Sequence, residues 1–216
     1  MAISKKVSQN KYILITVIIL AIGIIAALFV LTKNKKPTTA QDTVVVSADQ
    51  PSEKKPQDEG YVWNGGADDP KKIRISSIDL DGYVQKVGID KNNRVAAPNN
   101  IYLAGWFVDS KKPGEDGLSI IDGHYDGIQS GSKGIFYRLT ELKKTDTFEV
   151  ELGSSQIKKY EIISVDTLDT DKTAAVLFSQ DPMVKSQLNL ITCSGDYDTS
   201  AKSYNKRTVV SAKLIQ

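Results

Sequence analysis

The sequence of 216 residues contains only one cysteine and one histidine. A single cysteine excludes a disulfide bond within the chain. One cysteine and one histidine also cannot fill a four-ligand zinc site without two carboxylates, and no carboxylates in the sequence have the spacing for that role. Cys193 and His124 are therefore either isolated structural residues or parts of a site in which a thiol reacts.

A strong excess of either charge is also absent. The chain has 28 Lys and Arg residues against 26 Asp and Glu residues, which gives a net charge of +2, and it has no dense basic stripe. We therefore expect no nucleic-acid partner. No internal repeat of about 20–50 residues is visible, which argues against a solenoid or a propeller. Once its ends are set aside, the chain is long enough for one well-packed domain.

Charged residues are missing from one long stretch, residues 12–31. A helix of this length, at about 1.5 Å per residue, would span the roughly 30 Å hydrocarbon core of a membrane. A cleaved signal peptide has a shorter apolar region followed by small residues, whereas Lys33, Lys35 and Lys36 follow here. We expect residues 12–31 to form an uncleaved transmembrane helix. No cysteine follows this run directly, so a lipoprotein anchor has no acceptor.

The segments on either side of this stretch give the expected topology. Residues 1–11 carry three lysines and the terminal amine, so the positive-inside rule favours a cytoplasmic N-terminus and an extracytoplasmic domain. Residues 32–67 are polar and contain Pro37, Pro51 and Pro56. We expect them to form a flexible linker with a root-mean-square span of about 30–35 Å. The domain would then work near the surface of the cell membrane.

Residues 68–216 contain short runs in which apolar residues recur at every second position. Turn-forming pairs such as Asp81-Gly82 separate these runs, and helical patterns are limited to residues 135–139 and 174–178. This organisation predicts a mostly-β domain with short helices, either a barrel or a sandwich. The clearest period-two runs are residues 73–76, 147–152 and 160–165 and the runs around Cys193 and Arg207.

Cys193 follows the apolar run 188–192 and precedes Ser194-Gly195-Asp196, so we expect it at the end of a strand beside a loop. A lone cysteine is often a small buried hydrophobic residue, and an inert core position is the plain alternative. A thiol outside the cytoplasm that has no second cysteine to pair with favours a reactive role instead.

His124 and Arg207 also border apolar runs. His124 follows the run 118–121, and the expected strand end is where barrels present catalytic groups. Arg207 begins the run 207–212, and alternation places it on the same face as Val209. A guanidinium keeps its charge, so it can stabilise an oxyanion without exchanging a proton. The plain alternatives are a structural histidine and a solvated arginine. A thiol, a proton donor and a fixed cation together indicate acyl transfer through a thioester.

Short motifs surround these three residues in the order His, Cys, Arg. They are Gly-His at 123–124, Leu-Ile-Thr-Cys at 190–193, the arginine-bearing run 206–212, Ala-Gly-Trp-Phe at 104–107, Pro-Gly-Glu-Asp-Gly at 113–117 and Phe-Tyr-Arg-Leu at 136–139. Together they resemble the motifs of the sortase family, and the resemblance extends over residues 68–216. The motifs around His124, Cys193 and Arg207, at this spacing and behind the expected membrane anchor, are together a specific signal.

The motifs do not all point to the same subclass of sortase. The Gly-Trp stretch and the compactness are similar to classes E and F, whereas Arg207, three residues after Tyr204, is placed more as in class A. The sequence also departs from the family pattern. Residues 73–78 lack the usual proline, and Tyr125 follows His124 where valine or serine is common. None of these departures removes a catalytic group.

The resemblance implies an eight-stranded sortase-type β-barrel and cysteine transpeptidation. Cys193 would attack the Thr–Gly carbonyl of a Leu-Pro-x-Thr-Gly-like sorting signal, and His124 would transfer protons to the leaving amine and from the incoming one. Arg207 would hold the substrate backbone and the oxyanion, and Thr192 would line the pocket. The implied partners are surface proteins that carry a sorting signal and an amine acceptor, either a cell-wall precursor or a pilin lysine.

No cofactor is expected. Some sortases bind calcium, and Asp166, Asp169 and Asp171 form an acidic stretch. Acidic loops are usually solvated, so the sequence does not predict a calcium site here.

Two other classes of protein stay open. One is another cysteine acyl-transferase or peptidase. An L,D-transpeptidase carries arginine two residues after its cysteine, where Gly195 stands here, and a papain-like peptidase has its cysteine before its histidine. The other is a non-catalytic membrane-anchored β-domain that binds a surface partner and keeps Cys193 buried and inert.

Overall fold

The computed structural model describes residues 44–46, 50–127 and 131–216. The predicted cytoplasmic N-terminus, the predicted membrane span and the first part of the predicted linker lie outside these ranges. Among the described residues, no helix is both long enough and apolar enough to cross a membrane.

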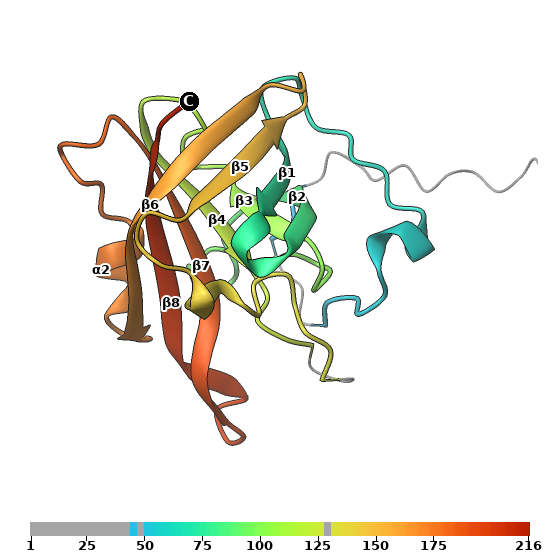
Figure 1. The fold of residues 1–216 in the computed structure, drawn as a ribbon. Coiled ribbons are helices and arrows are strands. Elements are labelled where there is room, and N and C mark those ends of the chain that lie inside the picture. The colour runs from blue at the N-terminus through green and yellow to red at the C-terminus, as the bar shows by residue number, and fades with distance from the viewer. Residues whose placement is uncertain (1–43, 47–49, 128–130) are drawn as a thin grey trace, which may run out of the picture. The chain divides into compact units, whose positions relative to one another are not determined.

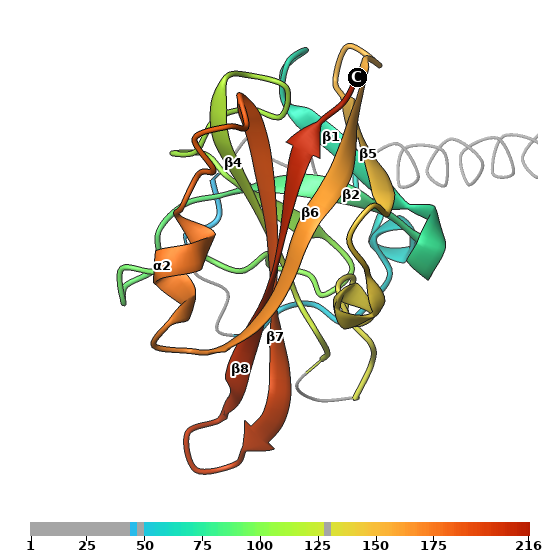
Figure 2. The same cartoon turned by 60° about the vertical axis from the view of Figure 1, so that its left-hand side comes forward.

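Eight strands in the described ranges close into a barrel (Figure 1, Figure 2). Their order around the barrel is β1-β2-β3-β4-β7-β8-β6-β5. Neighbouring strands are antiparallel except for the parallel pairs β2–β3 and β4–β7. The prediction of a mostly-β, eight-stranded barrel is confirmed. The strands are β1 (Pro70–Ile75), β2 (Leu80–Val87), β3 (Ala104–Phe107), β4 (Gly117–Gly123), β5 (Thr147–Leu152), β6 (Ile157–Asp169), β7 (Ser186–Asp198) and β8 (Ser203–Leu214).

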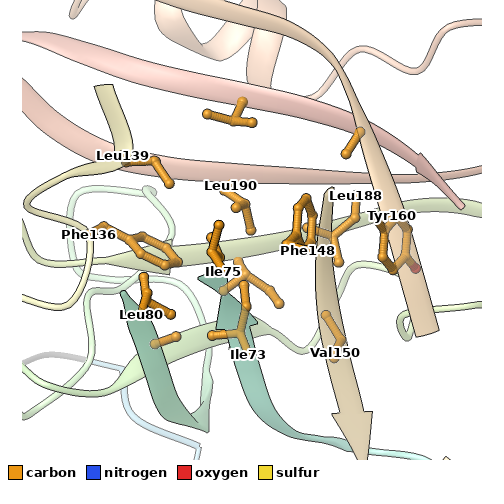
Figure 3. Close-up of a cluster of buried hydrophobic side chains, with 14 of the residues drawn as sticks. Ile73, Ile75, Leu80, Phe136, Leu139, Phe148, Val150, Tyr160, Leu188 and Leu190 are labelled. Atoms are coloured by element: carbon orange, nitrogen blue, oxygen red, sulfur yellow. The ribbon is translucent and has the colours of Figure 1, made fainter. Parts of the chain in front are cut away.

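Side chains at alternating strand positions fill the inside of the barrel. Ile73 and Ile75 on β1, Val150 on β5, and Leu188 and Leu190 on β7 are all fully buried in one cluster (Figure 3). Burying an aliphatic side chain of this size stabilises the fold by about 1.5–3 kcal/mol. The period-two runs in the sequence therefore lie in β1, β5, β6, β7 and β8 because one face of each strand packs into this core.

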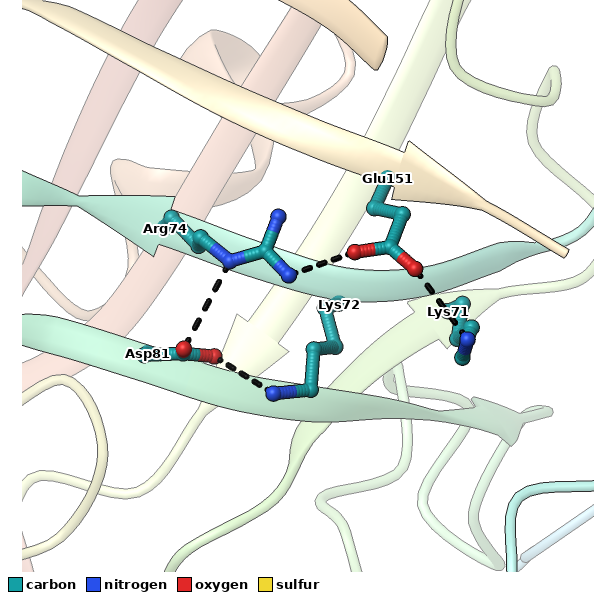
Figure 4. Close-up of polar contacts among 5 residues, drawn as sticks. All are labelled: Lys71, Lys72, Arg74, Asp81 and Glu151. Atoms are coloured by element: carbon teal, nitrogen blue, oxygen red, sulfur yellow. Dashed lines mark hydrogen bonds and ion pairs between the residues drawn. The ribbon is translucent and has the colours of Figure 1, made fainter. Parts of the chain in front are cut away.

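The other face of β1, β2 and β5 carries charged residues. Arg74 lies between two carboxylates, with Nη2 2.5 Å from Glu151 Oε2 and Nε 3.5 Å from Asp81 Oδ2 (Figure 4). Lys71 pairs with Glu151 and Lys72 with Asp81, each at 3.1 Å. Ion pairs near the surface contribute only about 0–1 kcal/mol each, so this network adds little to stability beside the apolar core.

Helical structure is short, as the sequence predicts. The predicted stretch 174–178 forms a helix, and the predicted stretch 135–139 forms turns that lead into a 3₁₀-helix. The longest of these helices, α2, packs against β8 on the outside of the barrel, and both views show it there. The short helices in the described ranges are η1 (Pro56–Glu59), η2 (Ser76–Ile78), η3 (Leu139–Glu141) and α2 (Thr173–Leu177).

The described part of the predicted linker runs along the barrel. The backbone N–H of Val45 donates to the carbonyl of Lys86 at 3.0 Å, and that of Ser52 donates to the carbonyl of Asn99 at 2.8 Å. The same segment contains η1. These bonds connect it to β2 and to the loop between β2 and β3.

Candidate active site

A cavity of about 320 Å³ lies on the outer side of the barrel, beside β7, β8 and α2. Three of the four residues predicted for the site, Thr192, Cys193 and Arg207, line this cavity, whereas His124 lies outside the lining. The loop between β2 and β3 closes another side. The apolar base of the cavity includes Ile191 of β7 and Leu177 of α2, which pack in one apolar cluster with the fully buried Val209 of β8.

Cys193 and Arg207 face each other across β7 and β8. They are register partners in an antiparallel pair, so their side chains emerge on the same face. The Arg207 guanidinium is held by its own strand, because Nη1 donates to the Tyr204 carbonyl at 2.9 Å and Nη2 to Ser203 Oγ at 3.3 Å. No hydrogen bond joins it to Cys193 in the described ranges. Its positive charge nevertheless acts on the Cys193 thiol.

The Cys193 thiol is partly buried, and its surroundings disfavour the thiolate. Burial raises the pKa of Cys193 to about 11, and this effect outweighs the opposing charge of Arg207. The carboxylates of Asp122 and Asp126 raise that pKa further. The thiolate is the nucleophilic form of cysteine, so the thiol must lose its proton as the reaction proceeds.

The prediction that Cys193 ends a strand is wrong. β7 continues to Asp198, and its pairing with β8 shifts register in a bulge between Ser194 and Tyr197. Gly195 in this bulge has φ +81°, which glycine adopts without strain. The hairpin therefore extends beyond the barrel (Figure 2). A turn-like sequence inside a bulged strand reads as a loop, which explains the error.

His124 directly follows Gly123, the last residue of β4. Its ring nitrogen Nε2 donates to the Pro98 carbonyl at 2.7 Å. Burial lowers the pKa of His124, against the opposing effects of that hydrogen bond and of the Asp126 carboxylate. Because Nε2 is engaged, Nδ1 is the nitrogen that could exchange a proton with a substrate. No hydrogen bond joins His124 to Cys193 in the described part of the chain.

The backbone at His124 is fixed from two sides. Phe136 N donates to the His124 carbonyl at 3.0 Å, and a Cβ on Gly134 would lie 2.3 Å from the same carbonyl oxygen, so only glycine allows this approach. On the other side, Thr192 Oγ1 donates to the Gly123 carbonyl at 2.8 Å. Thr192 thus lines the cavity, but its hydroxyl connects β7 to the end of β4.

Three charged residues of the cavity were missed in the sequence. Asp122 on β4 lies two positions before His124 and lines the cavity. Asp90 and Arg94, from the loop after β2, line it as well and form an ion pair of 2.9 Å. The acid directly after the apolar run 118–121 was a usable signal for Asp122. Nothing in the sequence connected the Asp90 loop with Cys193.

The acidic stretch considered for calcium lies at the end of β6. Asp169 pairs there with Lys172 at 2.7 Å. In the ranges that the structure describes, no group of three or more His, Cys, Asp or Glu side chains could hold a metal ion.

Comparison with known proteins identifies the family. A family model described as the sortase domain matches residues 73–215. The chain belongs to the sortase family. Sortases are cysteine transpeptidases. The match therefore assigns the chain to this family and not to the L,D-transpeptidases or the papain-like peptidases.

Solved sortases share the fold at low sequence identity. A lid mutant of sortase A from Corynebacterium diphtheriae is 22% identical with a TM-score of 0.51, and the match covers 68% of this chain and 70% of that one. Sortase C2 of pilus island 1 from group B Streptococcus is 18% identical with a TM-score of 0.50, covering 70% and 77%. No curated protein matches the chain. The similarity to classes E and F stays a prediction.

Proposed function

We propose that this sortase is an active transpeptidase that uses Cys193 as nucleophile, His124 as proton-transfer group and Arg207 as fixed cation. The observation that carries the proposal is the facing of Cys193 and Arg207 across β7 and β8, in one cavity with an apolar base. A nucleophile beside a permanent cation is what acyl transfer requires, since the cation can stabilise the oxyanion of the tetrahedral intermediate.

The proposed reaction has two acyl-transfer steps. Cys193 Sγ, as thiolate, attacks the Thr–Gly carbonyl of a Leu-Pro-x-Thr-Gly-like sorting signal, and the C–N bond breaks as the His124 imidazolium gives its proton to the leaving glycine amine. The resulting thioester is then attacked by the acceptor amine, whose proton passes to His124 while Cys193 leaves as thiolate. Arg207 would turn from the Tyr204 carbonyl toward the oxyanion in both steps.

The apolar base of the cavity supports a sorting signal as substrate. Ile191 lines the cavity and lies on the same strand face as Cys193, so an aliphatic side chain or a proline two to three residues before the cleaved bond would contact it. Burial of such side chains supplies binding energy of about 25 cal/mol per Å². The acceptor would be an amine of the cell-wall precursor or a pilin lysine.

The membrane position is part of the same proposal. Residues 12–31 would anchor the protein as a single-pass transmembrane helix, with residues 1–11 in the cytoplasm and the catalytic domain outside. The apolar stretch and the family's action on surface proteins support this arrangement. Residues 32–67 would form the tether.

A second candidate function is a non-catalytic β-domain in which Cys193 is inert. The raised pKa of Cys193 and the bonding of the Arg207 guanidinium to its own strand favour this alternative. The same features fit a resting enzyme that is activated when substrate enters the cavity.

A product assay separates the two candidates. The full chain in detergent is incubated with a panel of Leu-Pro-x-Thr-Gly peptides and a glycine-based amine, and the products are separated by chromatography. We expect a peptide ending at threonine that is joined to the amine, together with the released glycine fragment. Absence of both products across the panel would contradict the transpeptidase proposal. Products cut elsewhere than Thr–Gly would instead contradict the proposed sorting signal.

A further inference from the structure

Asp122 has a position that the proposed mechanism does not use. It lies on β4 opposite Ile191 of β7, in parallel register. Ile191 and Cys193 are two positions apart on β7, so they share a face, and Asp122 lines the same cavity as Cys193 and Arg207. Three strands therefore place a carboxyl group, a thiol and a guanidinium around one cavity.

The Asp122 carboxyl group is enclosed although its residue as a whole is only partly buried. Burial raises the pKa of Asp122 to about 7, against the lowering effects of the Gly123 N–H and the Arg207 charge. The Arg207 guanidinium bonds to the Tyr204 carbonyl and to Ser203, so it acts on Asp122 through its field. Asp122 is thus a carboxyl group whose charge changes near neutral pH.

The other charged groups around this cavity leave Arg207 as the cation that Asp122 and Cys193 share. Arg94 is paired with Asp90 at 2.9 Å. The His124 ring donates to the Pro98 carbonyl, and burial lowers its pKa, so it is mainly neutral at pH 7. The groups facing the site from the surrounding elements are Cys193 on β7, Arg207 on β8, Asp90 and Arg94 in the loop after β2, and His124 and Asp126 after β4.

We propose that Asp122 is a positioning residue that controls the ionisation of Cys193, because its carboxylate competes with the Cys193 thiolate for the positive charge of Arg207. When Asp122 is ionised, the cavity already holds one negative charge and Cys193 stays a thiol. When Asp122 is neutral, the charge of Arg207 is available to the thiolate. The inference rests on the proposed role of Cys193 as the reactive thiol.

Alkylation of the full chain by iodoacetamide tests this inference without any peptide substrate. The sequence has one cysteine, so the reaction reports on Cys193 alone. At about pH 8.5, Asp122→Asn should alkylate about threefold faster than the wild type or more, since each pKa unit changes the thiolate fraction about tenfold. At about pH 5.5 the ratio should approach one, because Asp122 is then neutral in the wild type. Asp109→Asn, an exposed site on the turn after β3, is the matched control with a ratio of one throughout.

A purely structural role would not produce a rate ratio that follows the titration of Asp122. A ratio that is flat with pH, or below one at high pH, would overturn the inference. Asp122→Ala removes the carboxylate without adding an amide and should give the same pattern. The wild type gives a check that needs no variant: its rate should rise less than about tenfold per pH unit around neutrality and more steeply above, and a constant slope would refute the competition.

The inference and the proposed function fail in different ways. An alkylation ratio that does not change with pH, together with normal peptide transfer, would reject the proposed role of Asp122 but not the transpeptidase function. A pH-dependent alkylation ratio without any peptide transfer would support the charge competition but reject the transpeptidase function.

Discussion

The two faces of β4, β7 and β8 differ in what they carry. On the inner face, Ile121, Leu190 and Val210 are fully buried in the barrel core. On the outer face of the same three strands lie Asp122, Cys193 and Arg207 around the cavity. Neighbouring residues along one strand thus belong to two different environments, because side chains alternate across a sheet.

The difference lies in how each face is covered. The inner face is closed by the other strands of the barrel, whereas the outer face is covered by the five residues of α2 and the loop after β2. The short cover leaves a cavity in which charged groups are desolvated without being closed off from a substrate. Stability should therefore depend on the inner face and activity on the outer face.

The largest expected effect comes from the outer face. Cys193→Ala should abolish peptide transfer, because no other thiol is present in the chain. Its free energy of unfolding should change by less than about 1 kcal/mol, because the side chain is small and borders the cavity. Product formation and urea unfolding are measured on the same preparation. If Cys193→Ala kept a substantial fraction of the wild-type transfer rate, activity would not depend on Cys193 on the outer face.

An adjacent pair of residues tests the inner face. Leu190→Ala should lower the free energy of unfolding by about 2–5 kcal/mol, since Leu190 is fully buried in the barrel core. Ile191→Ala should cost less, because Ile191 borders the cavity, but it should raise the KM for the sorting peptide more than Leu190→Ala does. Urea unfolding ranks the two variants by their loss of stability, and peptide kinetics ranks them by their KM. Equal stability losses with equal KM values would contradict the comparison.

A third expected effect is on the pH dependence of stability. The pKa of Asp122 is about 7 in the folded protein and about 3.9 in an unfolded chain, so the folded state binds the extra proton between these values. Its contribution is fully present at low pH and is lost as the pH rises toward 7. Asp122→Asn should flatten this decline and make the protein more stable than the wild type at pH 8. An unchanged slope in chemical unfolding between pH 4 and 7 would show that Asp122 is solvated.

Local patterns in the sequence predicted the parts of the fold that depend on neighbouring residues. Runs with period two predicted the strands, and Ala174 to Phe178 predicted the helix that became α2. The bulge after Cys193 was missed because Gly195 and Asp196 are typical of turns. Its pairing resumes at Tyr197 and Tyr204, whose rings lie 5.2 Å apart, and this contact depends on the partner strand.

Motifs in the sequence predicted candidate site residues but not the environment of those residues. Cys193, Thr192 and Arg207 were expected from motifs, and the structure places them on one cavity. The acid at Asp122 was left out because an acidic residue on an alternating strand reads as solvent-facing. Its burial comes from α2 and from the loop after β2, which are distant in the sequence. Burial of this kind depends on tertiary packing, which local patterns do not report.

Mass spectrometry can detect directly whether Cys193 forms a thioester with a sorting signal. The full chain is mixed with a Leu-Pro-x-Thr-Gly peptide without an amine acceptor, quenched in acid, and examined by intact-mass spectrometry followed by peptide mapping. We expect an added mass equal to the peptide up to its threonine, located at Cys193 and removed by hydroxylamine. A protein that cleaves or transfers the peptide while its mass stays unchanged, or that carries the adduct on another residue, would contradict it.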